Sequence, residues 1–289
     1  MRAAILLSTS CLFTIACSHT GITVGSKNFT EQLILGEIVA QHLERRLHVS
    51  VDRKLNLGGT LLAHEALAGG SIDLYPEYTG TAIAAVLKEA PQRDQTATLT
   101  HLNEAYKRRW KLEWMPPLGF ENTFAMVVTG DRARAGGLHA LSEAARQPEP
   151  WRLGAGYEFV RRADGLPGLV KAYGLRLRGD PVIMDLGLLY RSLESGQTDM
   201  VAGNSTDGVI AARHLTVLAD DKHYFPRYDC GIVVRESALQ RFGGLRGALA
   251  ELSGKISDAG MRRMNYEVDG KHRSPREVAA DFLAANEGK

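Results

Sequence analysis

The sequence has few cysteines and no grouping of residues that suits a metal ion. Its 289 residues include three cysteines, and two of them, Cys11 and Cys17, lie in an apolar segment at the N-terminus. We therefore expect no disulfide framework. The nine histidines never occur as His-x-x-x-His and no Cys-x-x-Cys is present, so neither a zinc nor a haem site is expected. Cys230 precedes the apolar run 231–234, where a small buried thiol is the simplest interpretation.

Charge of one sign is never concentrated in this chain. The 35 basic and 33 acidic residues are mixed along the sequence and leave a formal net charge of +2. Nucleic acids are bound mainly through concentrated positive charge. We therefore expect neither DNA nor RNA as a partner.

Sequence signatures of catalysis are missing as well. There is no Gly-x-Ser-x-Gly elbow and no phosphate-binding loop, and Gly154-x-Gly156 lacks the third glycine of a dinucleotide-binding fingerprint. We expect no cofactor. An enzyme is the less favoured class, although two-lobed α/β folds also host catalysis in the crevice between their lobes.

The N-terminal segment 1–17 has the proportions of a secretory signal. Arg2 precedes an apolar stretch over 3–16 that is too short to span a bilayer and ends at Cys17. Thr14 is a weak substitute for the leucine that is usual in lipoprotein signals. The segment is compatible with a lipid anchor at Cys17 and equally with release of the chain, and both predict a periplasmic or other extracytoplasmic location.

One pattern occurs twice and suggests two equivalent lobes. Leu-x-x-Gly-x-x-Asp ends at Asp73 in the first copy and at Asp199 in the second. Each copy predicts a helix that a glycine closes in the left-handed conformation, followed by a short apolar strand. A single copy could be an ordinary helix-to-strand turn, but two copies at corresponding places favour duplication. The chain, with 44% hydrophobic residues, is large enough for two cores.

Strands and helices are expected to alternate in both halves, which predicts a largely parallel α/β sheet in each lobe. We expect 21–120 and 222–289 to form lobe I and 121–221 to form lobe II, with hinges around 119–123 and 218–224. The expected strands are 22–25, 49–57, 72–75, 124–128, 152–156, 181–184, 199–202 and 232–234, with a return crossing over 215–226. The expected helices are 30–46, 60–67, 88–113, 166–173, 187–195 and two terminal helices.

Two polar segments of the first lobe are expected beside a crevice, because ligands of open α/β sheets bind beyond the carboxyl ends of the strands. Lys27 follows the first strand, where a helix N-terminus and a cation suit a negatively charged group. Alternatively, Asn28 or Thr30 merely caps the helix and Lys27 is solvated. Tyr75 and Tyr78 offer ring faces to a cation, although we expect one of the two to be a core residue.

The second lobe contributes an arginine and two further segments. Arg162 follows a strand end and can bind a carboxylate through two hydrogen bonds, a contact of about 1.5 to 3 kcal/mol. The alternative is a surface arginine. Segments 203–208 and 224–229 complete the expected wall on this side.

Five motifs, in order, resemble the substrate-binding proteins of the osmoprotectant ABC importers. They are GSKNFTEQLILGE, NLGGT, YPEYTGT, NSTDG and DDKHYFPRYD. The similarity extends from Ile22 to about Leu283. It implies a type II periplasmic-binding-protein fold that closes on glycine betaine, choline, carnitine or a related quaternary ammonium compound. It also implies delivery to a permease in the inner membrane, or alternatively presentation of the ligand to a sensor.

The resemblance further implies which residues contact the ligand. Betaine-binding members hold the trimethylammonium group in an aromatic box and the carboxylate on lysine, threonine and arginine. The matching positions are Tyr78, Phe124 and Tyr228 for the box and Lys27, Thr81 and Arg162 for the carboxylate, with Gln32 within reach.

Asn204 departs from the pattern of this family, because members with a full box tend to have a tyrosine there. Losing one ring removes about 1 to 2 kcal/mol of cation binding, about tenfold in affinity, and introduces an amide donor. The ligand is therefore expected to be betaine-like or a different zwitterion such as ergothioneine.

Overall fold

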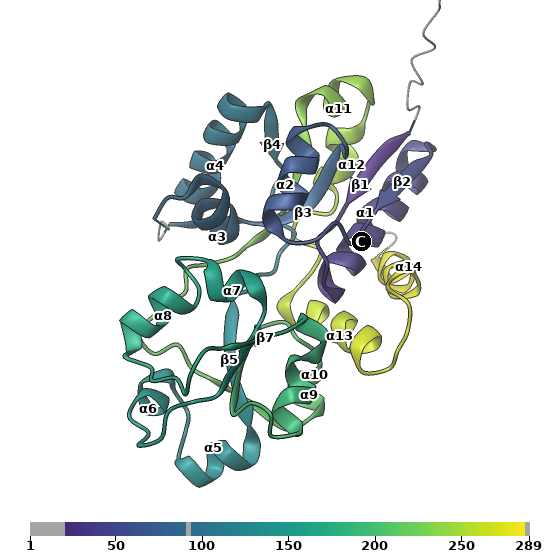
Figure 1. The fold of residues 1–289 in the computed structure, drawn as a ribbon. Coiled ribbons are helices and arrows are strands. Elements are labelled where there is room, and N and C mark those ends of the chain that lie inside the picture. The colour runs from purple at the N-terminus through teal and green to yellow at the C-terminus, as the bar shows by residue number, and fades with distance from the viewer. Residues whose placement is uncertain (1–20, 91–93, 287–289) are drawn as a thin grey trace, which may run out of the picture.

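A computed structural model describes residues 21–90 and 94–286, which form two lobes, each built on a five-stranded sheet (Figure 1). In spatial order, the first sheet contains β2 (Val51–Lys54), β1 (Ile22–Gly25), β3 (Leu74–Tyr78), β10 (Cys230–Arg235) and β4 (Leu112–Trp114). The second contains β7 (Val182–Ile183), β6 (Leu153–Ala155), β8 (Met200–Asn204), β5 (Phe124–Thr129) and β9 (Leu215–Leu218). The expected signal and Cys17 lie outside the described residues.

Each sheet combines parallel strands with one strand that runs the other way. β1, β2 and β3 are parallel to one another, whereas β10 is antiparallel to both of its neighbours. In the second sheet β5 has this position, antiparallel to β8 and β9. The chain enters β5 and β10 from the other lobe, so these strands start at the edge where the parallel strands end. The sheets are therefore less parallel than expected.

The return crossing begins later than the sequence predicted. Residues 215–218 form β9, an edge strand of the second sheet paired with β5. The crossing comes after it, and Asp229 forms an antiparallel bridge with Glu121 of the outgoing crossing. The first part of the expected crossing, 215–218, thus belongs to a partly exposed sheet edge.

Helices pack on both faces of each sheet and separate distinct cores. In the first lobe, Leu74 and Tyr78 of β3 pack in the core under the helix α1 (Thr30–Leu47), whereas Tyr75 packs in the opposite core with α2 (Thr60–Ala68). The other helices of this lobe are α3 (Thr79–Thr81), a π-helical turn (Ala82–Leu87), α4 (Gln95–Trp110), α11 (Glu236–Arg241), α12 (Leu245–Ala250), α13 (Asp258–Asp269) and α14 (Pro275–Asn286). None of the helices within the described ranges is long and apolar enough to span a bilayer.

The second lobe contains shorter helices around its sheet. They are α5 (Gly130–Gly136), α6 (Leu141–Ala145), α7 (Tyr157–Arg161), α8 (Leu166–Tyr173), a 3₁₀ turn (Leu186–Leu188), α9 (Leu189–Glu194) and α10 (Val209–Ala212). Its strands divide in the same way, because Met200 and Ala202 of β8 pack in one core and Val201 packs in the other.

Two expectations about helices are wrong. The helix expected over 88–113 begins later, because Lys88 adopts the left-handed conformation and Asp94 caps the start of α4. Lys111, with φ 59°, ends α4 before β4. Four terminal helices stand where two were expected, because Gly244 (φ 84°) and the N-cap Ser257 divide this region into shorter elements.

The repeated helix-to-strand turn is present in both lobes. Gly70 and Gly196 adopt positive φ angles of 80° and 70°. Each following aspartate accepts a hydrogen bond from a backbone N–H beside the neighbouring strand, Asp73 at 2.8 Å and Asp199 at 3.2 Å. The two aspartates thus join the start of their strands to the neighbouring strand. Cys230 is fully buried, as expected.

Candidate ligand-binding cleft

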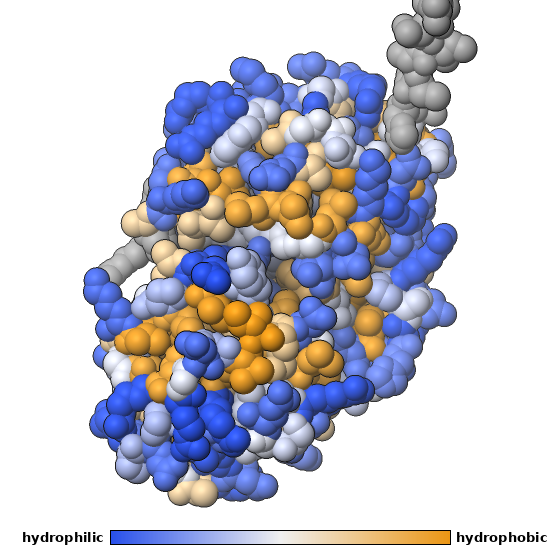
Figure 2. All heavy atoms as spheres, in the orientation of Figure 1, coloured by the Kyte–Doolittle hydropathy of each residue, from blue (hydrophilic) through white to orange (hydrophobic). Residues whose placement is uncertain are grey.

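A cleft of about 2580 Å³ lies between the lobes, beyond the carboxyl ends of β1, β3, β6 and β8. Pockets that enclose a small ligand are usually about 300 to 1,000 Å³, so this cleft is larger than a small ligand requires. Figure 2 shows the hollow with apolar side chains on both of its lips. Its exposed apolar residues are Leu61 and Leu62 of the first lobe and Tyr157, Ile183 and Leu188 of the second.

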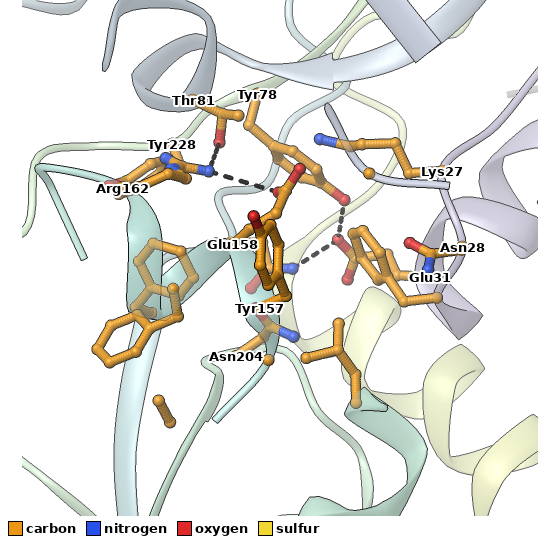
Figure 3. Close-up of a pocket in the computed structure, with 18 of the residues that line it drawn as sticks. Lys27, Asn28, Glu31, Tyr78, Thr81, Tyr157, Glu158, Arg162, Asn204 and Tyr228 are labelled. Carbon is orange, nitrogen blue, oxygen red and sulfur yellow. Dashed lines mark hydrogen bonds and ion pairs between the residues drawn. The ribbon is translucent and has the colours of Figure 1, made fainter. Parts of the chain in front are cut away.

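Seven of the eight residues expected to contact the ligand line this cleft. They are Lys27, Tyr78, Thr81, Phe124, Arg162, Asn204 and Tyr228. They come from both lobes and from the return crossing, and Figure 3 shows several of them around one space.

Lys27 is buried and its charge is already compensated. Its Nζ lies 2.5 Å from Glu77 Oε1 and 3.4 Å from Thr60 Oγ1, and its side chain is 4% exposed. The same Nζ lies 4.7 Å from the centre of the Tyr78 ring. The interpretation of Lys27 as a solvated residue is therefore wrong, and an incoming anion would share this ammonium group with Glu77.

The start of α1 carries no side-chain cap. Its N-cap is Phe29, so the alternative in which Asn28 or Thr30 caps the helix is wrong. Thr30 instead donates from Oγ1 to Asp269 Oδ1 at 2.6 Å, and Asn28 lines the cleft. The polar residues around Lys27 are thus turned toward the cleft and toward α13.

Arg162 is held in place by a carboxylate of its own lobe. Its Nε and Nη2 donate to the two oxygens of Asp164 at 2.9 and 2.5 Å, and its Nη1 donates across the cleft to Thr81 Oγ1 at 3.3 Å. The arginine side chain is 10% exposed, so the surface alternative is wrong. Its guanidinium carbon lies 5.2 Å from the ring centre of Phe124 and 6.0 Å from that of Tyr228.

The three expected box residues do not form one closed box here. Phe124 and Tyr228 meet edge to face with ring centres 5.8 Å apart, whereas Tyr78 stacks on Phe29. Tyr75 is fully buried in the core and donates its hydroxyl to Glu77, which confirms that one tyrosine of the pair is a core residue.

Gln32 does not reach the cleft surface, contrary to expectation. It is fully buried, donates from Nε2 to the Tyr78 hydroxyl at 3.1 Å, and accepts at Oε1 from the backbone N–H of Lys27 at 3.2 Å. The first turn of α1 points this side chain back toward β3. Gln32 therefore orients two cleft residues from behind.

Glu31 is a cleft residue that sequence reasoning missed. Its carboxylate accepts hydrogen bonds from the Tyr78 hydroxyl (2.6 Å), Asn122 Nδ2 (2.9 Å), Thr206 Oγ1 (2.6 Å) and Asn265 Nδ2 (3.0 Å). Burial raises the pKa of Glu31, while these hydrogen bonds act in the opposite direction. All four donors are neutral, so a negative charge here is not cancelled by these contacts. The only sequence signal was its place in the motif that contains Lys27.

Asn204 ends β8 and is linked to a second, partly buried carboxylate. Its backbone N–H donates to Asp207 Oδ2 at 2.9 Å, and the Tyr190 hydroxyl donates to the same oxygen at 2.5 Å. Burial raises the pKa of Asp207 to about 6, and the nearby charge of Glu31 adds to this increase. Asn204 therefore lines the cleft with an amide, at the position where a tyrosine would complete the aromatic box.

Comparison with known proteins places this arrangement in a family. The family model described as the substrate-binding domain of ABC-type glycine betaine transport systems matches residues 20–285. The chain belongs to this family. Its two lobes have the type II periplasmic-binding-protein fold, and a crystal structure of a "glycine betaine/carnitine/choline ABC transporter" matches with a TM-score of 0.76. That chain is 32% identical, and the match covers 92% of this chain and 98% of that one.

Two proteins that are similar to this chain differ in length. The ergothioneine transport permease/ergothioneine binding protein EgtU of Helicobacter pylori (strain G27) is 35% identical over 96% of this chain, which spans 50% of EgtU. The carnitine transport binding protein OpuCC of Listeria monocytogenes is 32% identical over 99% of this chain and 97% of its own length. The chain thus spans about half of EgtU and almost all of OpuCC.

Proposed function

We propose that this protein captures a quaternary ammonium zwitterion in the cleft and delivers it to the permease of an ABC importer, releasing it unchanged. The observation that carries the proposal is that Arg162 and the rings of Tyr78, Phe124 and Tyr228 line one cleft between the lobes. A fixed cation and electron-rich rings in one space suit a ligand with both charges.

The anionic end of the ligand is assigned to Arg162, Thr81 and Lys27. Asp164 occupies Nε and Nη2 of Arg162, which leaves the Nη1 edge beside Thr81 for a carboxylate. Figure 3 shows Arg162 and Thr81 on one side of the space and Lys27 on the other. Charge-assisted contacts of this kind contribute about 1.5 to 3 kcal/mol.

The cationic end is assigned to Tyr78, Phe124 and Tyr228, supported by Glu31. Each ring contributes about 0.5 to 2 kcal/mol to cation binding, depending on how far water is excluded. The Glu31 carboxylate accepts a hydrogen bond from the Tyr78 hydroxyl at 2.6 Å and places an acidic group at this end.

Binding is proposed to close the cleft. We take 21–120 with 222–289 as one lobe and 121–221 as the other, hinged around 119–123 and 218–224. Since the open cleft is larger than a small zwitterion, contact with both lobes at once stabilises the closed state over the open one.

Export is part of the same proposal. Segment 1–17 directs the chain out of the cytoplasm, with Cys17 either lipidated or removed from the mature start. Intact-mass measurement of the processed protein distinguishes a lipid at Cys17 from simple cleavage, and a cytoplasmic protein that retains 1–17 contradicts export.

Ergothioneine is a second candidate ligand, favoured by Asn204. The amide offers hydrogen bonds where a ring would offer only a face. EgtU, whose name includes ergothioneine binding, is also among the similar proteins.

Calorimetric titration with glycine betaine, carnitine, choline and ergothioneine tests the function. We expect saturable heat with at least one zwitterion, accompanied by a rise in melting temperature as bound ligand stabilises the folded state. Neither heat nor a thermal shift with all four compounds would overturn the proposal.

A further inference from the structure

A glutamate of the second lobe crosses the cleft and contacts the first. Glu158 Oε1 accepts from the backbone N–H of Thr60 at 2.5 Å, and Oε2 accepts from the Thr60 hydroxyl at 3.1 Å. Thr60 is the first residue of α2. A β-carbon at Gly59 would lie 2.3 Å from Glu158 Oε1, so glycine at this position is what lets the carboxylate approach so closely.

The Glu158 carboxylate lies among the residues assigned to the ligand's anion. Its Oε2 is 4.0 Å from Arg162 Nη1, which itself donates to Thr81 at 3.3 Å. The Thr60 hydroxyl that binds Glu158 is 3.4 Å from Lys27 Nζ. Figure 3 shows Glu158 pointing into the space between Arg162 and Lys27. The N-terminus of α2 adds a further preference for negative charge.

We propose that Glu158 occupies the place of the ligand's carboxylate and thereby determines how strongly the protein favours zwitterions over ligands without a carboxylate. This inference rests on the proposed function. Two carboxylates cannot share this site without strong repulsion, so a zwitterion must displace Glu158 from Thr60 as it binds. The side chain is 39% exposed and therefore has solvent into which it can turn.

The same contact has a second interpretation, in which Glu158 is a latch that holds the lobes together. The two interpretations predict opposite effects. If Glu158 competes with the ligand, neutralising it strengthens zwitterion binding and leaves choline unaffected, because choline has the same trimethylammonium group but no carboxylate. If Glu158 is a latch, neutralising it weakens the binding of every ligand to a similar extent.

Two variants measured by calorimetric titration separate these outcomes. Glu158→Gln removes the charge, and Gly59→Ala keeps the charge but prevents the carboxylate from reaching Thr60. For glycine betaine, carnitine or ergothioneine, whichever binds, we expect the dissociation constant to fall about tenfold in both variants, the effect of 1.4 kcal/mol. The constant for choline is expected to stay within about twofold.

The matched control is Glu149→Gln, which neutralises an exposed carboxylate of the same lobe that pairs with Arg178 at 3.0 Å. It should change neither the dissociation constant of the zwitterion nor that of choline. Equal weakening of all ligands, or an unchanged ratio between zwitterion and choline in both variants, overturns the role of Glu158. A wild-type protein that binds none of the four compounds instead refutes the proposed function.

Discussion

The two lobes share one turn but differ at the end of the strand that the turn introduces. In the first lobe, Asp73 accepts from the backbone N–H of Thr23 and from Arg241 at 3.0 Å. In the second, Asp199 accepts from the backbone N–H of Arg152 and also from its side chain at 2.8 Å. In both cases the aspartate fixes the start of a strand against the neighbouring strand.

Five residues after these aspartates, the likeness between the lobes ends. β3 ends at Tyr78, a ring beside Lys27 and Glu31, whereas β8 ends at Asn204, an amide beside Asp207. The common turn sets where a strand ends, and the last residue sets the chemistry offered to the ligand. The lobes are therefore alike as scaffolds and unlike as binding walls.

The largest expected effect concerns Asp207, on the wall of the second lobe. A folded-state pKa of about 6 instead of the ordinary 3.8 means that folding disfavours the ionised form of Asp207 by on the order of 3 kcal/mol. The folded state holds this proton more tightly than the unfolded chain, so the contribution to stability is present below about pH 4 and is lost as the pH rises to 6.

Replacing Asp207 by asparagine should therefore raise the free energy of unfolding at pH 7.5 and leave it almost unchanged at pH 4. Urea unfolding at both pH values measures the difference. A variant that is destabilised equally at both would show that the carboxylate charge is not the cause.

Arg162→Ala removes the anion contact of the second lobe and leaves the carboxylate of Asp164, 7% exposed, without its ion-pair partner, although the Tyr228 hydroxyl still donates to it at 2.6 Å. Losing about 1.5 to 3 kcal/mol of binding free energy predicts that the zwitterion binds about 10- to 150-fold more weakly. Choline should weaken less than about threefold, because it has no carboxylate to lose. Calorimetric titration of the variant with both ligands measures these changes, and Arg178→Ala serves as the surface control. Equal losses of affinity for the zwitterion and for choline would show that the ligand's carboxylate binds elsewhere.

Asn204→Tyr makes the end of β8 resemble the end of β3. A third ring beside Phe124 and Tyr228 should strengthen glycine betaine binding by about 0.5 to 2 kcal/mol, or about 2- to 30-fold. Titration with glycine betaine and ergothioneine measures the gain. If ergothioneine uses the amide, it should lose affinity while betaine gains, and identical changes would argue against that use.

The smallest effect is expected at the shared turn. The hydrogen bond from the Arg152 side chain keeps the pKa of Asp199 below its usual value, so its stabilisation is present above about pH 4 and is lost as the pH falls further. The pair is partly exposed, which limits its contribution to about 1 kcal/mol or less. Comparing the thermal stability of Asp199→Asn with that of the wild type at pH 7 and pH 3 should show a larger difference at pH 7 than at pH 3.

Much of this fold can be predicted from local sequence rules. The two glycine turns, the apolar strands after them and the five motifs predict two α/β lobes with a common crevice. The motifs assign Lys27 and Tyr78 to that crevice, and Arg162 is assigned to it from its position after a strand end. Those rules depend only on residues that are neighbours along the chain, which is why they can be applied to the sequence alone.

The remaining details depend on packing between distant segments. Gln32 belongs to the same motif as Lys27, yet only contact with Tyr78 decides that it lies behind the cleft. Glu158 reaches Thr60 from the other lobe, a contact that depends on how the lobes are placed. The partners of Lys27 and Arg162 likewise come from tertiary structure or from local backbone geometry that residue types alone do not specify.

Glu31 has a mechanical consequence beyond its charge. Its single carboxylate is bonded to β3 through Tyr78, to one crossing through Asn122, to the loop after β8 through Thr206, and to α13 through Asn265. A single carboxylate thus connects the first lobe, the outgoing crossing and the second lobe. Because the Tyr78 hydroxyl donates to that carboxylate, a ligand that binds against the Tyr78 ring contacts a residue linked to both lobes.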